Sequence, residues 1–404
     1  MKKHASALAI AALLAAPAAH SAVAVDFNGE FEANAVNLDN DEPGQEDGRG
    51  ILQLLRLGAN IKLDDGVQIV TRMNLSNRQW SGDRSNIDID IDGDDYAYSI
   101  DGAYSPDAAD NVTLDLGYLQ LPLGPGILRI GRQESNWGNC FVSCDDRRDR
   151  IQYVTRLGGT NIGLGYDKRV EGEFGPGPNT DDDQTGYYGF AVGQLGPVVA
   201  GLLIYHLRYD DNAATPMRDG TVTLVSPYFQ TKVAGIDLSG TFAYQNMDPG
   251  QGSMDDRLGA YLRAGYDFGV AKVEGQLVWT DGYAPNQGFD SFSSMINNSP
   301  ENKNSALSVE NIGADTIGFA ARVYGNVTEQ LKLVAAAGVY DDGDAFERGY
   351  RGRDVKLTFF DLQAHYQVTP STLIWATAGR VNVDPASGSD TDLTGLSLNV
   401  RTTF

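Results

Sequence analysis

The sequence predicts an all-β fold, a transmembrane antiparallel β-barrel of 16 to 18 strands. Three observations favour this fold: apolar and polar residues alternate with a period of two in many segments, the connections between these segments alternate between short and long, and the last segment ends on Phe404. Successive side chains of a strand point to opposite faces. The period of two therefore gives each strand one apolar and one polar face.

The N-terminus has the features of a secretory signal. Two lysines precede a short apolar run and a small-residue sequence that ends at Ala24. We therefore expect a signal peptide at 1–24, cleaved after Ala24. The apolar run is too short to span a bilayer as a helix. Residues 25–404 contain no Pro/Gly/Ser-rich linker, so we expect them to form one barrel domain.

Composition limits the classes of partner. The formal net charge is -23, and loss of Lys2 and Lys3 with the signal would make it -25. So acidic a chain is a poor partner for nucleic acid, whose phosphates bind clustered Lys and Arg. It suits lipopolysaccharide headgroups that are bridged by divalent cations. Two cysteines are too few for a disulfide-dense secreted scaffold.

The first predicted strand sets the pattern for the others. Val25, Phe27 and Phe31 lie on one of its faces, and Asp, Asn and Glu residues lie on the other. The same alternation recurs to the end of the chain and predicts eighteen strands. Their ranges are 25–35, 55–63, 67–75, 112–121, 127–132, 150–157, 161–170, 187–195, 198–209, 221–233, 238–246, 259–267, 272–280, 317–327, 331–340, 355–368, 372–383 and 393–404.

Short and long connections alternate along the chain. Every second connection is short and rich in turn residues. These turns are 64–66, 122–125, 158–160, 196–197, 235–237, 268–269, 328–330 and 369–371. The long connections are polar and acidic, and include 39–50, 82–111, 282–315 and 384–392. Short periplasmic turns and long outer loops are typical of a transmembrane barrel.

The ends of the predicted sheet must meet, because an open edge in hydrocarbon would leave backbone groups unpaired. The last strand resembles the C-terminal signal that the barrel assembly machinery reads in outer-membrane proteins. Leu396, Leu398 and Val400 alternate there with polar residues before the terminal Phe404. Thr402 stands where those proteins usually have an aromatic residue. The resemblance implies the assembly machinery as a partner and the Gram-negative outer membrane as the location.

The polar strand faces would line the lumen, and a barrel of 16 to 18 strands leaves a water-filled channel. Charged side chains in such a lumen stay hydrated. The arginines expected to point inward are Arg56, Arg72, Arg156, Arg263, Arg322 and Arg380. Aromatic residues near strand ends fit membrane-interface girdles better than sugar-stacking platforms. The expected girdle residues are Trp80, Trp279, Trp375, Tyr118, Tyr166, Tyr266 and Tyr366.

Residues 131–150, after the fifth predicted strand, resemble general porins. In that family the third long loop often begins with a Gly-Arg pair, here Gly131-Arg132, and folds into the barrel. The resemblance implies a homotrimer and a constriction where loop acids face wall arginines across a transverse field. The candidates are Glu134, Asp145, Asp146 and Asp149, with Arg56, Arg72, Arg132 and Arg156. Alternatively, 145–150 is a solvated loop whose acids pair with its own arginines.

The two cysteines, Cys140 and Cys144, lie four residues apart in this same segment. In an oxidising compartment, two cysteines at close spacing most often form a disulfide. Such a small ring removes little chain entropy, so we expect its effect to be local stiffening of the loop. Metal binding is disfavoured, since it would need four ligands.

A second motif lies at 88–95, where Asp88, Asp90, Asp92 and Asp94 alternate around Gly93. This spacing resembles the first half of a calcium-binding loop, but Ser99 stands where the glutamate at the twelfth position is expected. The sequence leaves two interpretations open, a Ca2+ site and a solvated acidic loop. No other cofactor is expected.

The predicted function is passive diffusion of ions and small hydrophilic solutes, and no enzymatic activity is expected. The acidic outer loops favour a mild preference for cations, which inward arginines could reverse. The main alternative is a substrate-selective barrel of 18 strands for sugars or carboxylates. An outer-membrane enzyme is disfavoured because His206 and His365 are too sparse for a triad. A soluble secreted adhesin is the remaining alternative.

Overall fold

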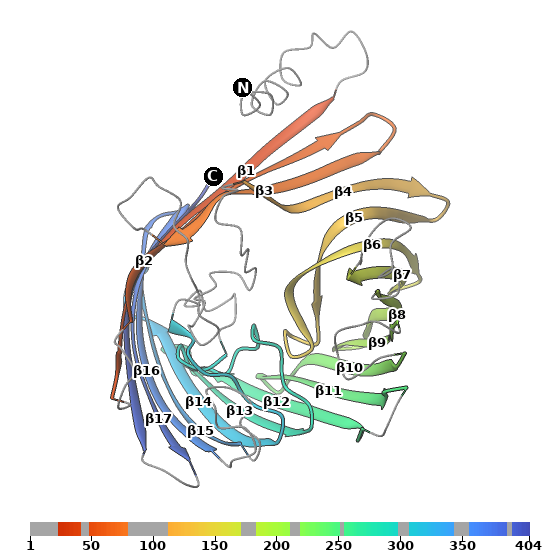
Figure 1. Cartoon of the computed structure of the whole chain (residues 1–404). Coiled ribbons are helices and arrows are strands. Elements are labelled where there is room, and N and C mark those ends of the chain that lie inside the picture. The colour runs from red at the N-terminus through yellow and green to blue at the C-terminus, as the bar shows by residue number, and fades with distance from the viewer. Residues whose placement is uncertain are drawn as a thin grey trace, which may run out of the picture.

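The computed structural model describes residues 23–41, 48–79, 112–170, 183–210, 219–250, 254–297, 307–342, 355–385 and 390–404. The predicted signal peptide (1–22 of it), Trp80 and the Asp-rich segment with Asp88, Asp90, Asp92 and Asp94 lie outside these ranges. The described residues form an eighteen-stranded sheet (Figure 1). Its strands are β1 (Ala24–Asn40), β2 (Gly48–Lys62), β3 (Gln68–Gln79), β4 (Thr113–Leu123), β5 (Gly126–Trp137), β6 (Ser143–Leu157), β7 (Thr160–Val170), β8 (Gln184–Leu195), β9 (Val198–Tyr209), β10 (Thr221–Val233), β11 (Ile236–Asp248), β12 (Arg257–Asp267), β13 (Lys272–Asp281), β14 (Thr316–Asn326), β15 (Leu331–Asp342), β16 (Val355–Thr369), β17 (Thr372–Pro385) and β18 (Thr391–Thr403).

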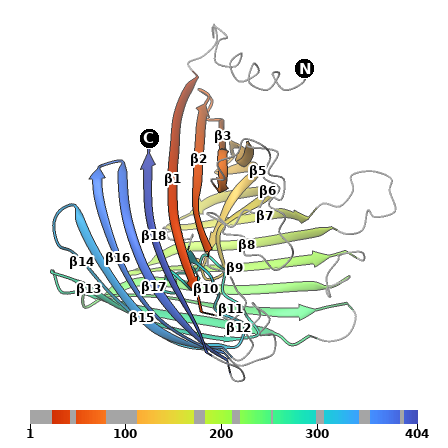
Figure 2. The ribbon, with the colours of Figure 1, turned by 60° about the vertical axis from the view of Figure 1, so that its left-hand side comes forward.

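The sheet closes on itself. Each strand pairs antiparallel with the next along the chain, and β1 pairs with β18 from Glu30↔Thr403 to Asn40↔Leu393. Figure 2 shows these two strands side by side. The terminal residue completes the seam, because the backbones of Gly29 and Phe404 exchange hydrogen bonds of 2.8 and 3.0 Å. The predicted closed barrel is therefore confirmed, with the higher of the two expected strand numbers.

Alternation along each strand sorts its side chains between the two surfaces of the barrel. Leu262, Leu277 and Phe319 lie in register on neighbouring strands and are about half exposed on the outer face. Tyr261 and Val278, one position along, are buried on the inner face. An apolar exterior around a mixed interior is what a lipid-facing wall requires.

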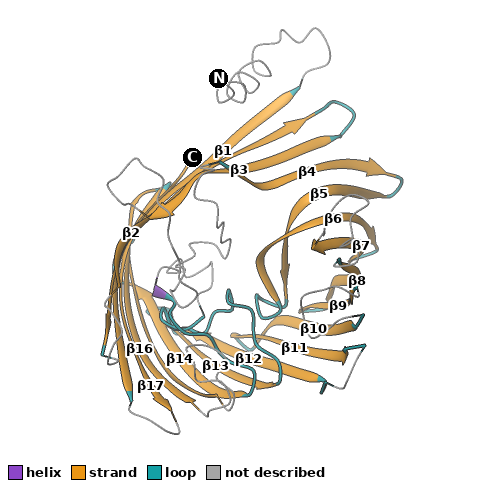
Figure 3. Cartoon of the chain, in the orientation of Figure 1, coloured by secondary structure: helices purple, strands orange, loops and turns teal. Residues whose placement is uncertain are grey.

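The eight short turns follow β2, β4, β6 and each later even-numbered strand, so all of them lie at one end of the barrel. Figure 3 shows these turns between long strands. The segment 131–150 differs from its expected loop. Most of it continues β5 and β6 as a paired hairpin, and only residues 138–142 form the connection. Residues 145–150 are all Asp or Arg, so this part of β6 has no apolar face that could reveal a strand.

Three side chains point to the opposite face from the one expected. Trp375 was expected in a lipid-facing girdle, but it is fully buried on the inner face, stacked on His365. Tyr118 shares the inward parity of Gln120, which accepts a bond from Arg129. Arg380 was expected to point inward, but it has the outward parity of Ile374 and pairs with Asp392 beside a long connection.

An apolar core lies inside one side of the barrel. The described parts of the connection between β13 and β14, 282–297 and 307–315, fold into the lumen, where Phe292, Met295 and Leu307 are almost completely buried. They pack against inner faces of β14 to β18, which offer Tyr340, Val355, Leu357, Phe359, Val381, Val383 and Leu393. Figures 1 and 3 show this segment within the barrel. Within the described residues, no helix has the length and apolar character needed to span a bilayer.

Candidate permeation pathway

The β5–β6 hairpin leaves the wall and crosses into the lumen. Trp137 Nε1 donates to the Ser226 carbonyl of β10 at 3.1 Å, and Thr241 Oγ1 of β11 donates to the Gly138 carbonyl at 2.8 Å. Strands β6 to β9 separate β5 from β10 and β11 around the barrel. The tip of this hairpin therefore lies inside the barrel, bonded to β10 and β11.

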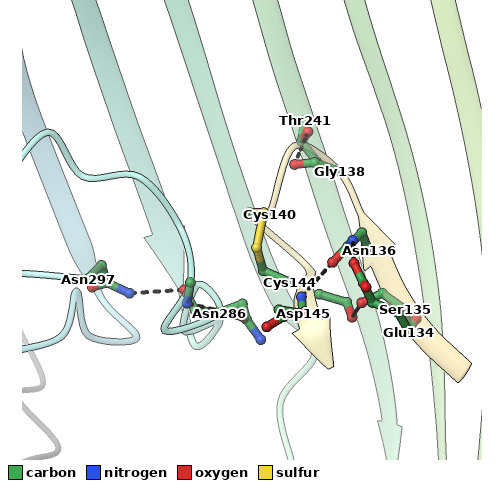
Figure 4. The surroundings of a disulfide bond; sticks show 12 residues. Glu134, Ser135, Asn136, Gly138, Cys140, Cys144, Asp145, Thr241, Asn286 and Asn297 are labelled. Atoms are coloured by element: carbon green, nitrogen blue, oxygen red, sulfur yellow. Dashed lines mark hydrogen bonds between the residues drawn. A yellow bond between two sulfur atoms is a disulfide. The ribbon is translucent and has the colours of Figure 1, made fainter. Parts of the chain in front are cut away.

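A disulfide between Cys140 and Cys144 closes the tip of this hairpin (Figure 4). The predicted bond is therefore present. Gly138, Asn139 and Cys140 all have positive φ angles, of 67°, 54° and 67°. This left-handed backbone turns the chain tightly enough for the two strands to return side by side.

The charged side chains of residues 145–148 in β6 point alternately to the two faces of the strand. Asp145 pairs with Arg147 on one face, at 2.7 Å between Oδ1 and Nη1. Asp146 pairs with Arg148 on the other face. This is the local pairing that the sequence left open as the alternative to a transverse field.

The remaining predicted constriction residues are not all brought together. Asp149 faces Arg132 at 3.4 Å, and both are partly exposed. The carboxylate of Glu134 accepts a 2.5 Å bond from Asn136. Arg156 lies at the opposite end of β6, where it donates to the Gly158 carbonyl at the turn.

Arg56 and Arg72 do converge, on a carboxylate that the sequence analysis missed. Asp115 is 4% exposed and contacts Arg72 directly, Arg147 Nε at 2.6 Å and Arg56 Nε at 4.0 Å. The register of β3 against β4 shifts at this residue. Asp115 points inward between Leu114 and Leu116, and the β-bulge shifts the alternation of the rest of β4 by one residue. A lone Asp in an apolar strand was the available signal.

A cavity of about 870 Å3 lies between the hairpin and strands β7 to β12. Its charged lining is predominantly basic. Six arginines and three carboxylates line it: Arg129, Arg148, Arg150, Arg169, Arg257 and Arg263, with Glu134, Asp167 and Asp290. Its aromatic lining residues are Trp137, Tyr188, Phe190, Tyr205, Tyr209, Tyr228, Tyr261 and Tyr283.

Several of these arginines are held in place by carboxylates. Arg150 makes a two-pronged pair with the fully buried Asp167, at 3.0 and 2.9 Å, and lies over the Tyr188 ring. Within the described ranges, no carboxylate lies within ion-pair distance of Arg129, Arg169 or Arg257. These three guanidinium groups therefore give the cavity its excess positive charge.

The segment 282–297 bounds the cavity on its other side. Its Asp290 carboxylate bridges Arg263 and Arg322, with Oδ2 to Nη1 distances of 3.3 and 3.1 Å. The Phe292 ring lies against both guanidinium groups. Burial raises the pKa of the Tyr283 hydroxyl, which stays protonated.

A second, smaller cavity of about 460 Å3 shares Asp290 with the first. It lies toward the turn end of β14 to β17, and Arg322, Lys332 and His365 supply its basic side chains. The Asp290 bridge therefore stands between the two spaces. Among the described residues, no group of three or more His, Cys, Asp or Glu side chains could hold a metal ion.

Comparison with known proteins gives the class of fold. No family model and no curated protein sequence matches the chain. Solved structures do match, among them Pseudomonas aeruginosa OccK9 (OpdG), with a TM-score of 0.60, 14% identity and coverage of 94% of this chain and 98% of that one. Acinetobacter baumannii OccAB3 matches with a TM-score of 0.59, 14% identity and coverage of 94% and 100%.

A third match is Pseudomonas aeruginosa OpdK, whose crystal structure was determined with vanillate. It has a TM-score of 0.59 and 12% identity, with coverage of 94% of this chain and 99% of that one. These likenesses show that the chain has the eighteen-stranded barrel fold of outer-membrane porins. At such low identity they concern the fold alone.

Proposed function

We propose that this protein is a channel of the Gram-negative outer membrane through which ions and small hydrophilic solutes diffuse passively. One observation carries the proposal: a closed wall with an apolar exterior surrounds a cavity lined by arginine, carboxylate and tyrosine side chains. Such a wall is stable in lipid, while charged residues inside it need water. The arrangement suits permeation, and no enzymatic activity is proposed.

We further propose that the channel prefers anions. The acidic outer loops led us to expect a mild cation preference, but the solute path is set by the cavity lining. That lining carries six arginines against three carboxylates. Charge rings in a narrow passage select ions of the opposite sign.

A second candidate is selective uptake of planar organic anions. Tyr188 stacks beside Phe190 and Tyr205, with ring centroids 6.4 and 6.0 Å away, and Arg150 lies over the Tyr188 ring. An aromatic surface beside a guanidinium group suits a flat carboxylate. Saturable flux of an aromatic carboxylate would favour this candidate, whereas flux that rises linearly with concentration favours simple diffusion.

The remaining partners stay proposals. We propose a homotrimer in lipid and lipopolysaccharide, assembled by the barrel machinery through its last strand. If the protein is a trimer, a mass measurement in detergent should give three times the mass of one chain. Ca2+ binding at Asp88, Asp90, Asp92 and Asp94 also stays a proposal, which calorimetric titration with calcium would test.

Reconstitution of the mature chain in planar bilayers tests the channel and its charge preference together. We expect discrete conductance steps and an anion-selective reversal potential across a KCl gradient. Replacing Arg129, Arg169 and Arg257 with Gln should reduce that selectivity, and Arg380→Gln on the outer face is the matched control. A cation-selective reversal potential would refute the charge preference, and the absence of conductance would refute the channel.

A further inference from the structure

The two segments that enter the lumen meet at a single aromatic side chain, Phe141. It lies at the tip of the β5–β6 hairpin and is completely buried. Its ring centroid lies 5.3 Å from that of Tyr261 on the wall, 5.5 Å from that of Tyr283 and 5.1 Å from that of Phe289. Tyr283 and Phe289 belong to the segment 282–297. One ring therefore contacts the wall and both infolded segments.

The backbone at this junction is also shared. The Phe141 carbonyl accepts a 3.0 Å bond from the amide of Asn286 and a 3.4 Å bond from the hydroxyl of Tyr283. The two segments approach closely, since a Cβ added at Gly288 would lie 2.7 Å from the Cβ of Cys144. A larger residue at that position would push the segments apart.

Each segment is anchored to a different part of the wall. The hairpin tip is bonded to β10 and β11 through Trp137 and Gly138. The other segment is bonded to β16, where Ser293 Oγ and the Ser294 amide donate to the buried Asp361 at 3.0 and 2.8 Å. The Phe141 contacts join two separately anchored structures.

The junction lies on the boundary of the larger cavity. Cys140 and Val142 beside Phe141, and Tyr283 and Asp290 across the junction, all line that cavity. The hairpin and the segment 282–297 thus form one continuous side of the passage only while they are joined. A gap at the junction would connect the cavity with the rest of the lumen.

We infer that Phe141 is the positioning residue that sets the width of the passage, by locking the disulfide-closed hairpin tip to the segment 282–297. The disulfide contributes because it closes the ring in which Phe141 is held, with Cys140 and Cys144 on either side. The inference rests on the proposed channel function, and it assigns the size limit to an aromatic contact and not to the charged side chains of the lining.

Single-channel recording of Phe141→Ala tests the inference. We expect roughly twofold higher conductance than wild type, because current through a hydrated pore grows with its free cross-section. Larger polyethylene glycols should also enter the pore. The variant should keep the heat-modifiable gel mobility of a folded barrel. Loss of that mobility would show that the barrel itself had unfolded. The matched control is Phe319→Ala on the outer face, which should conduct as wild type does.

Wild-type conductance and polymer exclusion in Phe141→Ala would overturn the inference without affecting the proposed function. A wild-type protein without any conductance would instead overturn the proposed function itself.

Reduction of inserted wild-type channels gives a test that does not depend on folding of a variant. A dithiol such as dithiothreitol transfers two electrons and two protons to Cys140–Cys144, which yields two thiols and the cyclic disulfide of the reagent. We expect the conductance to rise on reduction. The double variant Cys140→Ser, Cys144→Ser should not respond to the reagent. Unchanged conductance of the reduced wild type would overturn the inference.

Discussion

The two sides of the barrel interior differ, although their strands share one architecture. Strands β7 to β12 turn polar and aromatic residues such as Asp167, Tyr188 and Arg263 toward a cavity. Strands β14 to β18 turn apolar residues such as Leu357 and Val381 toward the infolded segment between β13 and β14. The difference shows that an inner barrel face can be largely apolar where an infolded segment covers it, and that a buried polar residue there, such as Asp361, is hydrogen-bonded by that segment. Where both faces of a strand are apolar, the inner face is covered by protein.

The largest expected effect comes from placing the same new charge on each side. Val381→Asp buries a carboxylate in the apolar core, since Val381 is fully buried. We expect the free energy of unfolding to fall by at least about 4 kcal/mol. Val192→Asp places its carboxylate at the cavity, and its effect should stay within about 1 kcal/mol. Unfolding in urea, followed by the gel band whose mobility changes on heating, measures the free energy of unfolding of both variants. Equal losses would contradict the difference between the two sides of the barrel.

Removal of the Asp290 carboxylate should have the next largest effect. Asp290→Ala leaves Arg263 and Arg322 without the carboxylate that they share, although Arg322 keeps Glu274 at 2.6 Å. We expect a loss of about 3 kcal/mol in the free energy of unfolding. Asp341→Ala, at an exposed position of β15, is the control. A loss no greater than in this control would show that the bridge does not hold the segment 282–297.

The attachment of this segment to β16 should contribute less. Ser294→Ala removes the hydroxyl that donates to Asp361, while the Ser293 hydroxyl and the Ser294 amide still donate. We expect a loss of about 1–2 kcal/mol, because the buried carboxylate keeps part of its hydrogen bonding. Differential scanning calorimetry in detergent would detect it. An unchanged unfolding temperature would mean that the apolar contacts alone hold the segment.

The prediction with the smallest effect on stability concerns two tryptophans that lie on opposite faces of the barrel wall. Trp279 is 43% exposed on the outer face, whereas Trp375 is fully buried inside. In variants that keep only one of these tryptophans, brominated lipid should quench Trp279 fluorescence strongly and leave Trp375 fluorescence almost unchanged. Replacing Trp279 with Phe should change stability by no more than about 0.5 kcal/mol. Stronger quenching of Trp375 would reverse our assignment of its face.

The strands and turns could be predicted from the sequence because their signal is local. Each of the eighteen predicted segments overlaps one strand, and the sorting of turns by parity follows from antiparallel pairing of neighbours. The disulfide was predicted for the same reason, since its cysteines lie four residues apart.

The contents of the lumen could not be predicted in this way. On β17, Ile374 and Ala376 alternate with Trp375 and Val381, so both faces are apolar and hydropathy cannot choose between them. The segment between β13 and β14, which is distant in the sequence, determines the inner face of β17, because it packs against Val381 and Val383. The β-bulge at Asp115 is likewise invisible in the period of two, and it explains why Tyr118 points inward, because it shifts the alternation of the rest of β4 by one residue.

Single-channel recording of the reconstituted mature chain tests the central claim most directly. That claim is that the closed wall keeps an open, water-filled path along the side of β7 to β12, despite the core on the other side. Our account predicts discrete conductance steps from protein that shows heat-modifiable gel mobility. Folded, inserted protein that leaves the bilayer electrically silent would contradict it.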